Sequence, residues 1–304
     1  MRAGGDASPT GMAGPATLRA ALSAAAALGL ERLDAQRLLL HVIGRRPDER
    51  AWLLAHDSDA LPGERAQTFA ALCARHAAGE PVAYLLGETE FYGLRLAVDG
   101  RVLIPRADTE TLVDWALQCL QGRAAPRVLD LGTGSGAIAL ALAHTRPDAH
   151  VDATDASAAA LAVARANAQR LALRVRFAQT DWLAGAKADA GTGIGTGMGT
   201  GYDLIVSNPP YIAEGDPHLA ALAHEPTAAL TAGPDGLHDL RRIIADAPSH
   251  LRPGGWLLLE HGYDQSDAVS VLLRQAGLAC VQSRKDLAGI QRCTGGCLRP
   301  VPSS

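Results

Sequence analysis

The sequence predicts an α/β protein: a Rossmann-like, mostly parallel sheet, preceded by a small helical domain and a linking β-hairpin. Three observations lead to this fold class. From Arg127 onward, short apolar runs typical of strands alternate with segments whose apolar residues recur every three or four positions. Before residue 85 only the helical period occurs. Between these two regions lies FYGLRLAVDGRVLIPR, in which apolar and polar residues alternate as in extended strands; this pattern favours a hairpin.

The N-terminal part divides into a tail, a domain and a connection. Residues 1–15 are rich in Gly, Ala, Ser and Pro, and we expect a flexible tail there. Residues 16–85 are expected to form the N-terminal helical domain. Its amphipathic segments are ATLRAALSAAAALGL, ERLDAQRLLLHVIG and GERAQTFAALCARHAAG. Residues 86–106 are expected to form the linking hairpin, with its turn at Asp99-Gly100.

Residues 107–304 are expected to form the second domain. It should open with a helix over TETLVDWALQCLQG, capped by Asp108. Strands then alternate with helices, in the order RVLDLG, SGAIALALAHTRP, VDATD and SAAALAVARANAQRL, the last capped by Ser157. The strands RVRFAQTD and YDLIVSN follow, then helix, strand and helix over GLHDLRRIIADAPSHLRP, GGWLLLEHG and DQSDAVSVLLRQAG. CVQSRKD and RCTGGCLRP are expected to be the last two strands. Such alternation is typical of a parallel sheet with helices on both faces.

Composition excludes several function classes. The 304 residues are 48% hydrophobic, which suits a globular core, and the net charge of −4 lacks the basic surplus of a dedicated DNA-binding protein. Five scattered cysteines include no C-x-x-C pair, so we expect free thiols in a reducing compartment and no metal site. No signal peptide or membrane-spanning stretch is visible, so a cytoplasmic protein is expected. The Gly/Thr-rich run within 185–201 follows no strand, so we interpret it as a flexible insertion.

A glycine-rich turn follows the first strand of the alternating region. LDLGTGSGAIAL has the strand–turn–helix context of a nucleotide-binding loop, with Gly132 and Gly134 at the turn. Asp155 ends the next strand, where a carboxylate can accept both hydroxyls of a ribose. The spacing does not separate NAD from another adenosine cofactor, and helix capping is the alternative role for Asp155. After the third strand, Trp182 offers a ring for an adenine and Asp181 an acceptor for its amino group; core packing is the alternative for Trp182.

The stretch SNPPY ends the fourth strand of the sheet. Neither proline can donate a ladder hydrogen bond, so the strand must stop at Asn208. The Asn208 side-chain oxygen and the Pro209 carbonyl can each accept one N–H of a planar amino group, and Tyr211 adds an aromatic wall. The nitrogen would then point at an electrophile in the glycine-loop site, and a sulfonium methyl is such an electrophile.

These motifs together resemble class I methyltransferases that use S-adenosylmethionine. More narrowly, the chain is similar to the HemK/PrmC family, the peptide-chain release factor glutamine-N(5) methyltransferases. The resemblance covers nearly the whole chain after the tail. It rests on PVAYLLGETEFYG, VLIPRADTE, TDW, SNPPYI and LLLEHGYDQ. Three departures stand out: Ala107 where the family usually has Pro, a shorter segment over residues 216–226, and the long Gly/Thr insertion.

The resemblance implies methylation of the glutamine amide in the Gly-Gly-Gln motif of release factors, in the cytoplasm. It implies cofactor contacts from Gly132, Thr133, Gly134, Ser135, Gly136, Asp155, Trp182 and Asn208. Asn208, Pro209, Pro210 and Tyr211 should hold the glutamine, with Asn208, Pro209 and Tyr211 acting in catalysis. The family's helical domain and hairpin recognise the release factor, so Phe91 and Arg106 are candidate contacts, with core packing as the alternative for Phe91.

Three other functions agree less well with these motifs. A nucleic-acid adenine methyltransferase also uses such a tetrapeptide, but it needs an electropositive groove and a target-recognition segment, and neither is visible. A NAD-dependent dehydrogenase would leave NPPY unexplained and lacks a convincing catalytic His/Lys/Tyr set. The third alternative is a binding module without enzymatic activity. It is disfavoured because the glycine-rich loop, Asp155 and NPPY are all intact.

Overall fold

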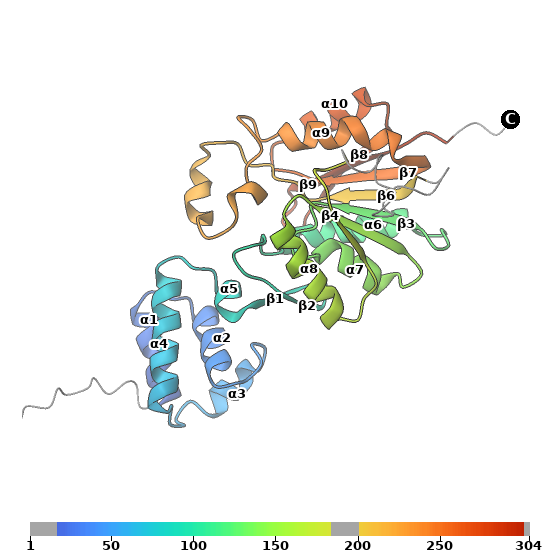
Figure 1. Cartoon of the computed structure of the whole chain (residues 1–304). Helices are drawn as coiled ribbons and strands as arrows, with labels where there is room; N and C mark the ends of the chain where they lie inside the picture. Colours follow the sequence, from blue (N-terminus) through green and yellow to red (C-terminus); the bar gives the residue numbers. More distant parts are fainter. Residues whose placement is uncertain (1–16, 184–200, 301–304) are drawn as a thin grey trace, which may run out of the picture. The chain divides into compact units, whose positions relative to one another are not determined.

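The structure is a computed structural model that describes residues 17–183 and 201–300. The chain divides into two compact units, Met1–Leu86 and Gly87–Ser304. Figure 1 shows the elements of each. The predicted tail and almost all of the predicted Gly/Thr insertion lie outside the described residues. Within the described ranges, no helix has the length and apolar character needed to cross a membrane.

The first unit is helical, as the period of its apolar residues predicts. A buried cluster centred on Leu38, Leu39, Leu40, Leu53 and Phe69 holds the helices together. The three predicted helices are present, whereas the two shortest, α3 and α5, were missed because six or five residues do not establish a period. The helices are α1 (Leu18–Ala27), α2 (Arg32–Val42), α3 (Arg50–Ala55), α4 (Gly63–Ala77) and α5 (Val82–Leu86).

The hairpin has a different turn from the predicted one. Strands β1 (Glu88–Phe91) and β2 (Leu94–Ala97) pair antiparallel around Tyr92 and Gly93, so the placement of the turn at Asp99-Gly100 is wrong. Tyr92 has φ 50° and Gly93 φ 73°, the positive values that a type I′ hairpin turn requires at both central positions. This shorter register buries Phe91, Leu94 and Leu96 together in the core.

A seven-stranded sheet forms the centre of the second unit, in the order β5-β4-β3-β6-β7-β9-β8. The strands from β5 to β7 run parallel, while β9 is antiparallel to both β7 and β8. This confirms a mostly parallel sheet and the two last strands. The strands are β3 (Arg127–Leu131), β4 (His150–Asp155), β5 (Arg176–Gln179), β6 (Tyr202–Ser207), β7 (Leu251–Glu260), β8 (Ala279–Lys285) and β9 (Gln291–Cys297).

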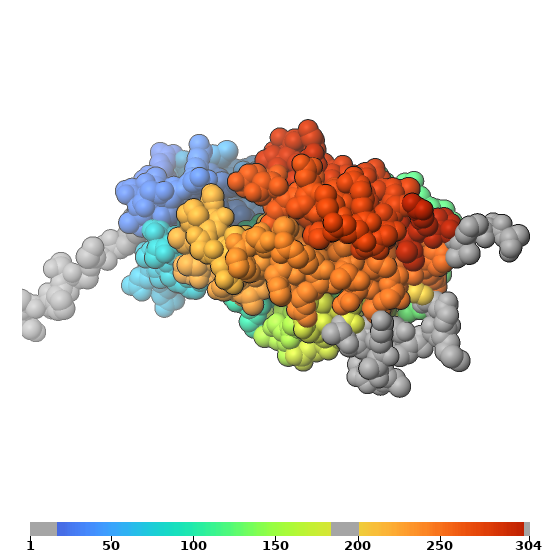
Figure 2. Space-filling model, turned by 90° about the horizontal axis from the view of Figure 1, so that it is seen from above, coloured from blue at the N-terminus to red at the C-terminus, as the bar shows by residue number. Residues whose placement is uncertain are grey.

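Helices cover both faces of this sheet (Figure 1). One face packs with the hairpin, α6 (Glu110–Cys119), α7 (Ala137–Thr145) and α8 (Ala158–Arg170). The other packs with α9 (His238–Asp246) and α10 (Ser266–Gln275), which occupy the orange and red surface in Figure 2. Neighbouring residues of each central strand enter opposite clusters, as Val128 and Leu129 do in β3, because side chains alternate across a strand.

The two predicted helix caps have different outcomes. Ser157 caps α8, since its hydroxyl oxygen accepts the Ala160 N–H at 3.1 Å. Asp108 does not cap α6: it lies in the short 3₁₀ turn Ala107–Thr109 and forms an ion pair with Arg292 at 3.3 Å. The 3₁₀ turn displaces the start of α6 by one residue, which the sequence pattern could not indicate.

Candidate active site

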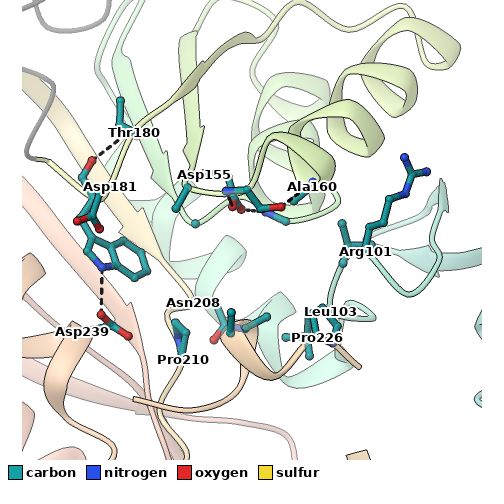
Figure 3. A pocket seen from close by; sticks show the side chains of 18 of the residues that line it. Arg101, Leu103, Asp155, Ala160, Thr180, Asp181, Asn208, Pro210, Pro226 and Asp239 are labelled. Carbon is teal, nitrogen blue, oxygen red and sulfur yellow. Dashed lines mark hydrogen bonds between the residues drawn. The ribbon is translucent and has the colours of Figure 1, made fainter. Parts of the chain in front are cut away.

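A cavity of about 330 Å³ lies beyond the carboxyl ends of the parallel strands, where ligands of such sheets bind. Its volume falls within the range of small-molecule sites. In Figure 3, Asp155 lies across the cavity from Asn208 and Pro210, with Asp181 and Asp239 at one end and Arg101, Leu103 and Pro226 at the other. Of the predicted site residues, seven line it: Gly132, Gly134, Asp155, Asp181, Trp182, Asn208 and Pro210.

The glycine loop forms the wall that follows β3. Gly132 has φ +68°, and a Cβ on it would come within 3.1 Å of the Trp182 ring. The missing side chain therefore lets the loop and the indole approach each other closely. The Gly134 N–H donates to Asp155 Oδ2 at 2.9 Å, and the Ser157 N–H donates to Asp155 Oδ1 at 2.8 Å. Asp155 thus fastens the loop to the start of α8, and its remaining lone pairs are available to a ligand.

The other three loop residues support the loop from behind. Thr133 and Ser135 are buried, and neither they nor Gly136 line the cavity. The Thr133 hydroxyl donates to Asp130 Oδ2 at 2.6 Å. Gly136 is the left-handed residue from which α7 begins. These residues shape the loop, while Gly132 and Gly134 present its surface.

Asn167 is a positioning residue that the sequence analysis missed. It is fully buried in α8, and its Nδ2 donates to the Ser135 carbonyl at 2.9 Å. The same amide exchanges two hydrogen bonds with the Ala97 backbone, at 2.7 and 3.0 Å. Asn167 therefore joins the hairpin, α8 and the glycine loop. The only signal for it was a polar residue on the inner face of a helix whose other buried residues are apolar.

Trp182 lies at one end of the cavity, and a hydrogen bond holds the Nε1 edge of its indole ring in place. Its Nε1–H donates to Asp239 Oδ1 at 3.1 Å, and its φ is +50°. Asp181 forms an ion pair with Arg242 at 2.6 Å. Asp239 and Arg242 both belong to α9 and also line the cavity. The Trp182 ring that was predicted to face an adenine is thus anchored on α9, which the sequence analysis did not connect with the site.

The NPPY segment leaves the sheet at the opposite wall. Strand β6 ends at Ser207, and the Asn208 Nδ2 donates to Thr109 Oγ1 at 3.3 Å. Because the amide nitrogen is used by Thr109, the oxygen is the end of the amide left for a ligand. Pro209 is buried, so among the two prolines only Pro210 lines the cavity.

Tyr211 does not line the cavity but is held at both its backbone and its hydroxyl. Its hydroxyl donates to Glu260 Oε1 over 3.4 Å, and its carbonyl accepts from Gln265 Nε2 at 2.9 Å. Gly236 passes so close that a Cβ on it would come within 2.2 Å of the Tyr211 carbonyl oxygen. The wall is therefore fixed from three places distant in the chain.

The two predicted partner contacts lie elsewhere. Phe91 is only 1% exposed and belongs to the core beneath the hairpin, which favours the packing alternative. Arg106 donates to the buried carboxylate of Glu225. Glu225 also accepts the Ile104 N–H at 3.1 Å. Glu225, which the sequence analysis missed, thus ties the segment after NPPY to residues 104–106.

The cavity fits an adenosine-containing cofactor. The glycine loop presents backbone at close range, Asp155 retains acceptor capacity for ribose hydroxyls, and the Trp182 ring and Asp181 flank one end. Within the described residues, no group of three or more His, Cys, Asp or Glu side chains is arranged to hold a metal ion. The five cysteines are free thiols.

Fold and site together define a class I methyltransferase, for which S-adenosylmethionine is the methyl donor. Residues 109–276 match the family model "Methyltransferase small domain", and residues 16–87 match "PrmC N-terminal domain". The catalytic domain of human Mettl16, solved with a MAT2A 3′UTR hairpin, shares the fold at TM-score 0.52 and 18% identity, over 70% of this chain and 78% of that one.

Curated relatives narrow the class to one family. A release factor glutamine methyltransferase of Bordetella pertussis is 56% identical over 272 residues, 89% of this chain and 96% of the relative. One of Xylella fastidiosa is 50% identical over 278 residues, 91% and 96% of the two chains. The chain belongs to the release factor glutamine methyltransferase family, which confirms the resemblance that the motifs indicated.

Proposed function

We propose that this protein methylates the side-chain amide of the glutamine in the Gly-Gly-Gln motif of peptide-chain release factors. The observation that carries the proposal is the orientation of Asn208. Its nitrogen donates to Thr109, so its oxygen is available to accept an N–H at the wall of the cavity. The relatives named above, which match over nine-tenths of their length, support the same reaction.

The residues have separate proposed roles in binding the cofactor. Gly132, Gly134, Asp155 and Trp182 line the cavity and would contact the adenosine part of the cofactor. Thr133, Ser135 and Gly136 would act by holding the loop in shape. Asn208 lines the cavity as well, so it would lie between cofactor and substrate.

S-adenosylmethionine supplies an electrophilic methyl group on a sulfonium sulfur. Asn208 Oδ1 and the Pro209 carbonyl would each accept one N–H of the glutamine amide, which turns the nitrogen toward that methyl group. Two acceptors on the N–H groups also favour the pyramidal nitrogen of the transition state over the planar amide. The nitrogen gains the methyl group and loses one proton, which we assign to water. Pro210 and Tyr211 would complete the wall around the glutamine.

The proposal also covers how the release factor is recognised and in which cellular compartment the protein acts. The helical N-terminal domain and the hairpin would recognise the release factor, with Arg106 as a candidate contact. No nucleic-acid substrate is proposed, since the net charge of −4 gives no basic surplus for phosphates. A substrate that acts in translation termination indicates the cytoplasm.

One labelling experiment tests the function. The purified protein is incubated with methyl-labelled S-adenosylmethionine and, separately, with a release factor, the same release factor carrying Gln→Ala in its Gly-Gly-Gln motif, and DNA. We expect label only on the unaltered release factor, on the motif glutamine by peptide mass spectrometry. Label on DNA, or equal label on both release factors, would contradict the proposal.

A further inference from the structure

Glu260 is a buried carboxylate behind the NPPY wall that has no role in the proposed reaction. It ends β7, is 1% exposed, and does not line the cavity. Its Oε1 accepts from the Tyr211 hydroxyl, whereas its Oε2 is buried without a hydrogen-bond partner among the described residues. A carboxylate half satisfied in this way costs stability, so its place beside the wall calls for a functional reason.

A chain of hydrogen bonds connects Glu260 with Asn208. The Thr109 hydroxyl lowers the pKa of Glu260 as a hydrogen-bond donor, and the Thr109 oxygen accepts from Asn208 Nδ2 at 3.3 Å. A hydroxyl has one proton to donate. When a charged carboxylate takes the Thr109 proton, the Thr109 oxygen can only accept, and Asn208 must turn its nitrogen toward Thr109 and its oxygen toward the cavity.

We propose that Glu260 is a positioning residue for methyl transfer, which fixes through Thr109 the direction in which Asn208 presents its amide oxygen and holds the NPPY wall through the Tyr211 hydroxyl. The inference rests on the proposed function and names the group that maintains its key orientation. A protonated Glu260 could donate to Thr109, and the Thr109 hydroxyl could then donate to the Asn208 oxygen, which reverses the amide.

The surroundings of Glu260 make this reversal accessible near neutral pH. Burial raises the pKa of Glu260 to about 7, and the charge of Asp108 acts in the same direction. Hydrogen bonds from Thr109 and Tyr211 and the charge of Arg292 oppose the rise. Cys293 on β9 is the cross-strand partner of Glu260, and the charge of Arg106 lowers the pKa of Tyr211 against the effect of burial. Burial keeps the thiol and the phenol neutral by raising the pKa of each, so Glu260 is the group of this cluster that titrates there.

The test compares Glu260→Gln with the wild type in single-turnover methylation of a release factor, with saturating cofactor, from pH 6 to pH 9. The wild-type rate should rise with pH along a limb near pH 7. In Glu260→Gln the limb should disappear, and the rate above pH 8 should fall by about tenfold or more. The dissociation constant of S-adenosylmethionine should stay within about threefold of the wild type, because Glu260 does not line the cavity.

Asp152→Asn is the matched control, because Asp152 is also a buried carboxylate of the sheet that accepts a tyrosine hydroxyl, that of Tyr202 at 2.8 Å. It should keep the wild-type pH limb. If Glu260→Gln does not fold, Thr109→Val is measured in its place and should lose the limb equally. If both single variants fold, the double variant Glu260→Gln/Thr109→Val is measured as well. It should be no slower than the slower single variant, because both substitutions break the same chain of hydrogen bonds.

An unchanged pH limb and rate in Glu260→Gln or Thr109→Val, or an equal change in Asp152→Asn, would overturn the inference. Failure of the proposed function is distinguishable, because the wild type would then leave the release factor unlabelled at every pH.

Discussion

Asn208 and Asn167 are the only two asparagines in the 304 residues, and the structure gives them opposite surroundings. Asn208 lines the cavity with its oxygen available, while Asn167 is fully buried, with three hydrogen bonds to the backbone and a fourth that its Oδ1 accepts from Arg170 at 3.2 Å. The same side chain is therefore used once to hold a ligand and once to hold the fold. This contrast allows each asparagine to serve as the control for the other.

Asn208→Ala should lose most of its turnover, by roughly 10²-fold or more, because it removes an acceptor that acts in the transition state. Binding of S-adenosylmethionine should partly survive, since the glycine loop and Asp155 are untouched. Single-turnover methylation measures the first quantity and calorimetric titration with the cofactor the second. Near-normal turnover in this variant would mean that the orientation argument is wrong.

At the scale of elements, Asn167→Ala should have the converse effect. It leaves the Ala97 N–H and carbonyl and the Ser135 carbonyl without their partner, at a cost of roughly 2–4 kcal/mol in the free energy of unfolding. The glycine loop should loosen, so the cofactor should bind more weakly. Urea denaturation and cofactor titration measure the two effects. The argument fails if Asn167→Ala is as stable as Asn208→Ala.

The order of strands and helices in the second unit was predictable, because each strand is a short apolar run and each helix shows its own period. The hairpin turn was not. Asp99-Gly100 carries the stronger local turn signal, but the burial of Phe91, Leu94 and Leu96 on one core fixes the register around Tyr92. Tertiary packing decides between two local alternatives that the sequence presents together.

The candidate site was predictable where a residue ends a strand, as Asp155 does, or directly follows one, as Asn208 does. Its supports were not, because they come from distant elements. Glu225 and Glu260 follow no nucleotide-binding pattern, and they reach the site only when segments 119 and 49 residues apart are brought together. Contacts of that range depend on the completed topology, which spacing along the chain does not indicate.

At the scale of the whole molecule, two buried carboxyls make stability depend on pH between their ordinary pKa values and neutrality. Burial raises the pKa of Asp130 and that of Glu260 to about 7. A raised carboxyl pKa means that the folded state keeps its proton where the unfolded state has released it, so stability falls as pH rises from about 4.5 to about 7. Burial lowers the pKa of His261, which acts in the opposite direction below its ordinary value.

We therefore expect Asp130→Asn to flatten the decline of stability between pH 5 and pH 7, by on the order of 1 kcal/mol per pH unit. The free energy of unfolding is measured in urea by tryptophan fluorescence. The experiment is made in a Trp52→Phe background, so that the three remaining tryptophans all report on the second unit. A slope in Asp130→Asn equal to that of the wild type would show that the Asp130 carboxyl is already charged in the folded state.

The strand order also bears on how the chain reaches its folded state. Strand β9 is the last in sequence, yet it lies between β7 and β8. Until it inserts, β7 presents an open edge, and an open edge can pair with other chains. The pairing of Glu260 with Cys293 belongs to this last step. During synthesis, the strand that carries Glu260 is therefore covered only after β9 has left the ribosome, so the support of the NPPY wall is completed late and the nascent chain depends on prompt closure of its sheet.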